Sequence, residues 1–449
     1  MKKTLAVVTS LFIFLGVVPS FANQVNTNPN DIAKTNKSRL LINLQEAHNK
    51  GYTGKDQVIV IIDDGVVLSN PVFTNRVIDG YCSSSVVCGE YYKKSGIEAG
   101  AAHKQPGFTF IPGHGTLVAS IAAGNSVGSF PGGIAPDAKI ISINNNNGNH
   151  QGILLALDWI LSVKNKYNIA AVNASFGFSP GGDRNRTDYC PIVSDIDQRL
   201  RELKNSNIPF VAAAGNNGGY TTVHYPACNT DTISVGALDE NGKIETYSDI
   251  SKEISVVAPA QVLGASAENN GFVIGAGTSS AAPVVAGSIA ILKQVKPNIT
   301  FDEIKKALMS SQVWVDDLVY TNLPMLNLKG SIDAVLSGKY STKTVQKSST
   351  QIVSTSLTYE LEKLKNDLST LKTELVALKS ENDNKQSMVN SLTNQLGELK
   401  KSNTELVIQQ NILNAELVSE KKKNADILKK VKIICSSKSR SALCRSLGL

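Results

Sequence analysis

Short unbroken apolar blocks recur through the first three quarters of the chain, with stretches of helical periodicity among them. The blocks lack the polar–apolar alternation of a strand with one wet face, so they fit strands buried on both faces of a parallel sheet. Alternating strands and helices predict right-handed crossovers and a three-layer α/β domain. The expected strands are 58–62, 139–143, 170–176, 209–214, 232–237 and 255–258, and the expected helices are 114–123, 152–165, 193–205 and 279–295.

The pattern differs at the two ends. Residues 1–22 combine Lys2 and Lys3, an apolar run over 5–18 and a small residue at Ala22, which is typical of a signal peptide. A membrane anchor is the alternative, but about 14 apolar residues are fewer than the ~20 that a spanning helix needs. We expect an exported protein (secreted, periplasmic or on the cell surface) with a short segment, 23–35, ahead of a domain over 36–337.

Residues 338–356 are rich in Ser, Thr, Lys and Gln, which predicts a flexible linker. From 357 to 431 a heptad register follows without a break, which predicts a coiled coil of about 110 Å. A single amphipathic helix is the alternative, but the apolar stripe is the narrow two-in-seven seam. Asn382, Asn403 and Asn424 lie in this seam and favour self-association in parallel register. A basic tail with two cysteines, 432–449, ends the chain.

Composition and charge narrow the functional classes. A net charge of +7 spread along the chain, with no basic patch among aromatic residues, does not indicate nucleic acid binding. Because export makes disulfides stable, we expect six bonded cysteines rather than free thiols. Proximity suggests the pairs Cys82–Cys88, Cys190–Cys228 and Cys435–Cys444, although six cysteines allow about 15 connectivities. No cysteine or histidine spacing fits a metal site, so no metal is assigned.

Four short motifs carry candidate chemistry, and each also has a purely structural interpretation. Asp63 ends a buried strand in Asp-Asp-Gly, and His114 opens an apolar helix. Ser279 lies where a small-residue loop enters a helix, which is also where an N-cap serine would lie. Asn216 follows a strand in Ala-Gly-Asn, which could be a simple turn. Ser279, His114 and Asp63 together resemble a nucleophilic hydroxyl, the base that accepts its proton and the carboxylate that orients the base.

The order Asp, His, Ser along the chain is one of three known for this constellation. Gly51–Gly54, Gly133–Pro136, Ser175–Gly177 and the Gly-Thr-Ser-x-Ala-x-Pro around Ser279 resemble the subtilase family over about residues 36–336. This resemblance implies a three-layer subtilisin-like domain with a mostly parallel sheet. It also implies a serine endopeptidase that hydrolyses peptide bonds through an acyl-enzyme, with no cofactor required for catalysis.

The resemblance also implies residue roles. Asp63 would orient His114, His114 would act as general base and acid, and Ser279 would be the nucleophile. Asn216 and the Ser279 N–H would form the oxyanion hole. Residues that would bind an extended polypeptide substrate, with bulky apolar P1 residues preferred by family habit, are Ser175, Phe176, Gly177, Ala213 and Gly215.

Several positions depart from the family pattern. Asp64 stands where Ser or Thr is usual, and strand alternation predicts that its side chain points away from that of Asp63. Val72 stands where many members have a calcium-binding Asp, which leaves structural calcium open. A catalytically inactive binding or scaffold protein of the same fold is the alternative function. We expect a homo-oligomer through the coiled coil and no transmembrane segment once the signal peptide is removed.

Overall fold

The computed structural model describes residues 28–84, 94–102, 113–145, 150–177, 190–268, 270–310, 313–317, 319–347, 419–427, 429–430 and 433. The chain forms two compact units, Met1–Val353 and Ser354–Leu449, and each is described by itself.

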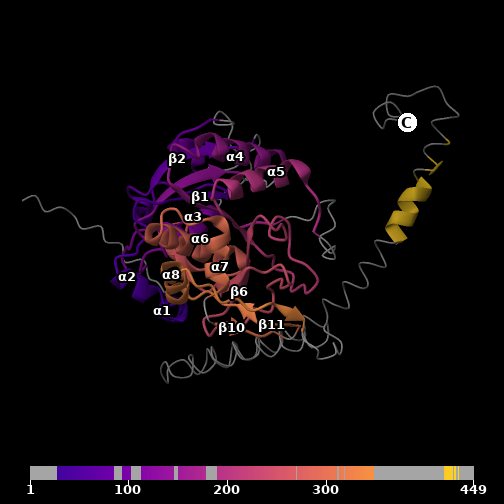
Figure 1. Ribbon diagram of the computed structural model, residues 1–449. Helices are drawn as coiled ribbons and strands as arrows, with labels where there is room; N and C mark the ends of the chain where they lie inside the picture. The colour runs from indigo at the N-terminus through magenta and orange to yellow at the C-terminus, as the bar shows by residue number, and fades with distance from the viewer. Residues whose placement is uncertain are drawn as a thin grey trace, which may run out of the picture. The chain divides into compact units, whose positions relative to one another are not determined.

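A seven-stranded sheet runs through the first unit (Figure 1). Its order is β2-β3-β1-β4-β5-β6-β7, and every neighbouring pair is parallel. Because β3 and β4 lie on opposite sides of β1, the strand order reverses at β1, which is where ligands bind in open parallel sheets. The strands are β1 (Val58–Asp63), β2 (Val77–Cys82), β3 (Lys139–Asn144), β4 (Ile169–Ala174), β5 (Phe210–Ala213), β6 (Ile233–Leu238) and β7 (Val256–Pro259).

Helices cover both faces of the sheet, so alternate residues of each strand face two separate cores. In β1, Ile59 and Ile61 belong to the core beneath α3 and α6, whereas Val60 and Ile62 belong to the core beneath α4 and α5. The helices are α1 (Pro29–Leu41), α2 (Leu44–Asn49), α3 (His114–Ala123), α4 (His150–Val163), α5 (Ser194–Asn205), α6 (Thr278–Val295), α7 (Phe301–Met309) and α8 (Leu328–Ser337).

Smaller elements complete the unit. They are the 3-10 turns η1 (Pro71–Phe73) and η3 (Ile97–Gly100), and the short strands β8 (Leu263–Ala265), β9 (Phe272–Ile274), β10 (Trp314–Val315), β11 (Tyr320–Thr321), β12 (Leu323–Pro324) and β13 (Gln346–Lys347). β8 pairs with β9, β10 with β12 and β11 with β13, each antiparallel. Of the last pair, β13 lies in the segment 338–356 that composition marks as a linker, and it pairs with β11 of the preceding domain.

The three-layer parallel fold predicted from the sequence is confirmed. Each predicted strand and helix is present with ends that differ by one or two residues, and α3 has the predicted bounds. The sequence reading omitted β2, whose Asp79 and Gly80 interrupt its apolar run, and the helices α1, α2, α7 and α8.

Little of the second unit is described. Residues 419–427 are helical, and the rest of the predicted coiled coil before them lies outside the described residues. Among the described helices, none is both long and apolar enough to cross a membrane.

Candidate active site

Three elements bring the predicted site residues to the carboxyl edge of the sheet. Asp63 is the last residue of β1, His114 is the first residue of α3, and Ser279 is the second residue of α6. α3 packs against both β1 and α6. Three residues from separate parts of the sequence therefore share one edge of the fold, at the point where the strand order reverses.

Asp63 and His114 form a close pair. The Nδ1 of His114 lies 2.8 Å from Oδ1 and 3.0 Å from Oδ2 of Asp63. The Asp63 side chain is 7% exposed, whereas that of His114 is 42% exposed and open to a partner on its other nitrogen. The negative charge of Asp63 raises the pKa of His114 to about 9, against a smaller opposing effect of burial.

Asp64 does not point away as strand alternation predicted, because β1 ends at Asp63 and the alternation ends with it. Its Oδ2 accepts a hydrogen bond from the N–H of His114 at 3.1 Å, and its Oδ1 accepts one from the N–H of Gly115 at 2.6 Å. A β-carbon on Gly115 would collide with the backbone oxygen of Gly65 and lie 2.8 Å from that carboxylate oxygen, so glycine is needed here. Asp64 thus caps the helix that carries His114.

Burial raises the pKa of Asp64 to about 6, and the neighbouring charge of Asp63 adds to this effect. Its two backbone hydrogen bonds act in the opposite direction because they stabilise the carboxylate. The site therefore holds two carboxylates beside one imidazole, and both raise the pKa of His114.

Ser279 is half-buried, and its Oγ donates a hydrogen bond to the carbonyl oxygen of Ser175 at 3.0 Å. Ser175 returns the contact, since its Oγ donates to the Ser279 carbonyl oxygen at 2.6 Å. The buried Asn173 donates from Nδ2 to the Ser175 Oγ at 3.0 Å. Within the described residues no hydrogen bond joins Ser279 to His114; in active sites such bonds often tighten only when substrate binds.

Asn216 lies in the loop after β5, with its amide held in one orientation. Its Oδ1 accepts from the N–H of Thr278 at 2.8 Å and from the Thr278 Oγ1 at 3.0 Å. Gly277 makes this possible with a φ of +78°, and a β-carbon there would lie 3.0 Å from the Asn216 Nδ2. The Nδ2 group makes no hydrogen bond within the described residues and remains an exposed donor beside Ser279.

The predicted substrate-binding residues lie on two neighbouring segments. Ser175, Phe176 and Gly177 follow β4, which ends at Ala174, two residues earlier than the expected strand 170–176. Ala213 ends β5, the next strand of the sheet, and Gly215 follows with a φ of +117°. The sequence reading omitted His224, whose side chain lies close to both segments.

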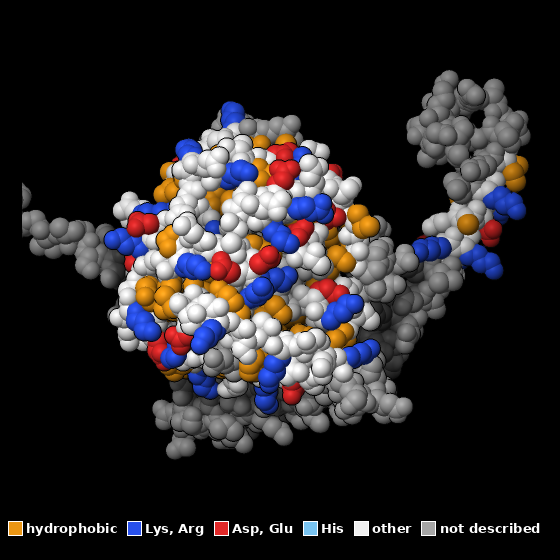
Figure 2. Space-filling model, in the orientation of Figure 1, with side chains coloured by type: hydrophobic (Ala, Val, Ile, Leu, Met, Phe, Trp, Pro, Cys, Tyr) orange, Lys and Arg blue, Asp and Glu red, His pale blue; other side chains and the backbone are white. Residues whose placement is uncertain are grey.

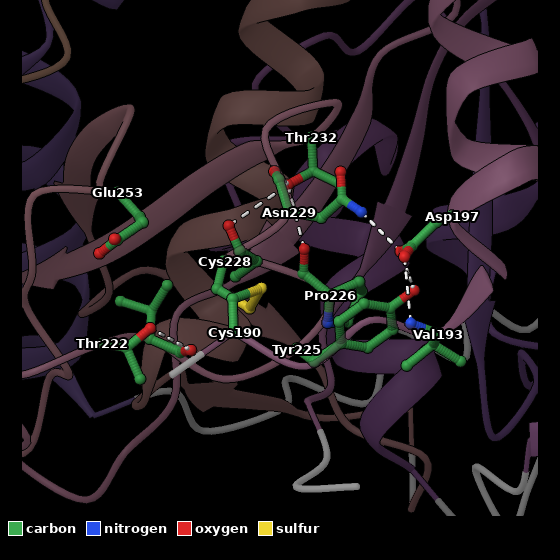
Figure 3. Close-up of a disulfide and its surroundings, with 12 residues drawn as sticks. Cys190, Val193, Asp197, Thr222, Tyr225, Pro226, Cys228, Asn229, Thr232 and Glu253 are labelled. Atoms are coloured by element: carbon green, nitrogen blue, oxygen red, sulfur yellow. Dashed lines mark hydrogen bonds between the residues drawn. A yellow bond between two sulfur atoms is a disulfide. The ribbon is translucent and has the colours of Figure 1, made fainter. Parts of the chain in front are cut away.

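One predicted disulfide is confirmed: Cys190 is bonded to Cys228, with 5.6 Å between their α-carbons (Figure 3). Cys82 is also disulfide-bonded, and its partner lies outside the described residues, as do Cys88, Cys435 and Cys444.

Metal ligands are not apparent in the described part of the chain. No three His, Cys, Asp or Glu side chains there cluster as a metal site requires. Val72 is fully buried and apolar, and calcium takes oxygen ligands, so this side chain supplies none.

A parallel α/β sheet with carboxylate, imidazole and hydroxyl gathered at its carboxyl edge has the arrangement of a serine hydrolase. Residues 54–331 match the model of the subtilase family. The chain is 27% identical to a thermostable alkaline protease of Halalkalibacterium halodurans, over 61% of this chain and 67% of that protein. It is also 27% identical to subtilisin DY of Bacillus licheniformis, over 65% of this chain and 96% of that protein.

Another relative is the minor extracellular protease Epr of Bacillus subtilis, which is 29% identical over 61% of this chain and 37% of that protein. A solved protease structure from Pseudoalteromonas arctica has the same fold, with a TM-score of 0.55 and 21% identity over 67% of this chain and 98% of that one. The chain belongs to the subtilase family of serine proteases.

Proposed function

We propose that the protein is an exported serine endopeptidase in which Asp63, His114 and Ser279 form the catalytic triad. The observation that carries this proposal is the pair of short contacts from the Asp63 carboxylate to Nδ1 of His114. Such a pair fixes the tautomer that leaves Nε2 to accept a proton, and it stabilises the imidazolium that forms afterwards. Ser279, at the start of α6, is the hydroxyl that would give up that proton.

The oxyanion hole in this proposal consists of the Asn216 Nδ2 and the N–H of Ser279. Support comes from the two hydrogen bonds that Thr278 donates to the Asn216 Oδ1, because they turn the amide so that its donor faces outward. A donor that is already oriented stabilises the developing charge without reorganisation.

The substrate would bind as an added strand along residues 175–177. Within the described residues, the backbone of Ser175 and Gly177 follows β4 without pairing to another strand of the sheet. An extended peptide could pair with its polar groups, although it would compete with the Ser279 hydroxyl for the Ser175 carbonyl oxygen. A peptide bound in this way would present its scissile carbonyl between Ser279 and Asn216, which favours a polypeptide substrate over a small ester.

Labelling with a fluorophosphonate probe tests the proposal. The parent should be labelled at one site and should cleave unfolded casein, whereas Ser279→Ala should lose both properties. Ser280→Ala, which alters the neighbouring hydroxyl, is the matched control and should still be labelled. Folded parent protein that takes no label would favour the alternative, an inactive binding or scaffold protein.

Self-association through residues 357–431 and export by the leader complete the proposal. The support is the heptad register and the apolar run over 5–18, together with extracellular relatives such as the Epr protease. Light scattering of the full-length Ser279→Ala protein should give an oligomer mass, and a monomer at micromolar concentration would contradict it.

A further inference from the structure

His224 lies between the two segments assigned to substrate binding. A β-carbon placed on Gly177 would lie 2.7 Å from the Cβ of His224, closer than real contacts allow. One placed on Gly215 would lie 3.0 Å from Cγ and Cδ2 of the same imidazole. The ring therefore occupies the space between these glycines, where the side chain of a substrate's P1 residue, whose carbonyl is attacked, would enter.

Polar groups surround this imidazole. Its Nε2 lies 2.8 Å from the Nδ2 of Asn217 and 3.4 Å from the Oδ2 of Asp249. Asp249 is fully buried, and its Oδ1 accepts hydrogen bonds from the N–H groups of Asn217 and Gly219 at 3.2 and 2.6 Å. Its Oδ2 makes no hydrogen bond within the described residues. A buried carboxylate oxygen with so few partners makes this end of the space strongly polar.

The segment that carries His224 is held from several sides. The N–H of His224 donates to the Ala214 carbonyl at 2.7 Å, and its own carbonyl accepts from the N–H of Cys228 at 3.1 Å. The Cys190–Cys228 disulfide fixes the segment four residues further on, beside the buried Tyr225 (Figure 3). The His224 side chain is only 15% exposed. The imidazole therefore has little freedom to move aside for a large substrate group.

We propose that His224, backed by Asp249, determines specificity by closing the P1 pocket into a short, polar one. This deepens the proposed function and rests on it. Phe or a long aliphatic P1 side chain would collide with the ring. A short apolar side chain would remove water from the imidazole and Asp249 without replacing the lost hydrogen bonds, whereas a short polar one would replace them. The preference is thus opposite to the bulky apolar one that family habit suggests.

Four peptides of the form succinyl-Ala-Ala-Pro-X, with X as Asn, Ala, Leu or Phe, test the proposal. Asn and Leu have nearly the same shape and so compare polarity, while Leu and Phe compare size. We would measure kcat/KM on the p-nitroanilides with the parent, and Kd of the corresponding amides by calorimetry with Ser279→Ala. We expect the kcat/KM and the affinity of the Asn peptide to exceed those of the Leu peptide by about tenfold, and those of the Phe peptide to be lowest. His224→Gly should raise the kcat/KM of the Phe peptide relative to that of the Asn peptide by about tenfold or more.

His150→Ala is the control, because His150 is a surface histidine paired with Asp195 at 2.7 Å, and its loss should leave the order unchanged. If the parent does not hydrolyse the peptides but the Kd values follow the expected order, the proposed protease function is refuted while the assignment of His224 to the P1 pocket stands. A parent that prefers Phe or Leu to Asn overturns the assignment even if His224→Gly does not fold. An order that His224→Gly leaves unchanged also overturns it.

Discussion

Asp64 is one of the residues at which this sequence departs from the family pattern. It contacts the backbone of His114 and Gly115, so one side chain both caps α3 and places a second negative charge beside the imidazole. A serine or threonine at this position could accept a hydrogen bond as a cap but would carry no charge. In the proposed mechanism His114 must be neutral to accept a proton, so the charge of Asp64 should affect the pH dependence of activity.

Asp64→Ser should move the acid limb of the kcat/KM profile to lower pH. In the parent, both carboxylates raise the pKa of His114, so the neutral base accumulates only as pH rises toward about 9. Removing the charge of Asp64 lowers that pKa, so activity at neutral pH should rise several-fold. A kcat/KM profile between pH 5 and 10 measures the effect.

Asp64→Asn serves as the control, since it also removes the charge but keeps the size of the side chain. Both variants should shift the limb in the same direction. Limbs that coincide with that of the parent in both variants would mean that Asp64 acts on stability alone.

At the scale of elements, the Cys190–Cys228 disulfide links the segment before α5 to the loop that carries His224. It closes a loop of 38 residues. Ring closure of that size restricts the unfolded chain, and the chain-entropy model gives about 4 kcal/mol of stabilisation. The loop also holds Tyr225, whose hydroxyl donates to Asp197 of α5 at 2.7 Å.

The double substitution Cys190→Ser, Cys228→Ser should therefore lower the free energy of unfolding by about 3–4 kcal/mol. Urea unfolding in the Ser279→Ala background measures this without autolysis. Thr222→Ser, a conservative change in the same loop, is the control. A loss below about 1 kcal/mol would indicate that neighbouring contacts already restrict this loop.

The sequence predicted the elements whose pattern is local. Continuous apolar runs such as Val58–Asp63 identify buried strands, and the helix from His114 to Ala123 was predicted with its observed bounds. β2 was missed because Asp79 and Gly80 lie in the strand itself; the carboxylate of Asp79 is held by Tyr167 and Lys166, both distant in sequence.

In the site, too, the features with a local sequence pattern were predicted, and those that depend on tertiary packing were not. Motifs were enough to select Asp63, His114 and Ser279, which the fold brings to one edge. The orientation of Asp64 depends on where β1 stops and α3 begins, and the position of His224 depends on how three loops pack together. Neither is encoded in a periodic pattern, so sequence reasoning misjudged the first and missed the second.

At the scale of the whole molecule, charges are interspersed on the face seen in Figure 2, where Lys and Arg alternate with Asp and Glu. The candidate site residues all lie in the first unit, Met1–Val353. That unit holds both hydrophobic cores, so the second unit should not be needed to assemble the active site.

A chain ending at Val353 should therefore keep kcat/KM within about twofold of the full-length value, because no site contact is lost. It should also lose the self-association proposed for residues 357–431. Peptide hydrolysis and light scattering on the two chains measure these effects. An inactive but folded truncated chain would assign the second unit a part in catalysis.

The two hydrogen bonds exchanged by Ser175 and Ser279 bear on the choice of inhibitors. In the free protein, the Ser279 hydroxyl, which we propose as the nucleophile, donates to a carbonyl on the segment proposed to bind the substrate backbone. In the proposed binding mode, an arriving peptide would bring its own N–H to that segment and compete for the carbonyl, which would free the hydroxyl to turn toward His114. Electrophiles carried on a peptide should therefore inactivate this enzyme faster, relative to small sulfonyl fluorides, than their intrinsic reactivities alone would indicate.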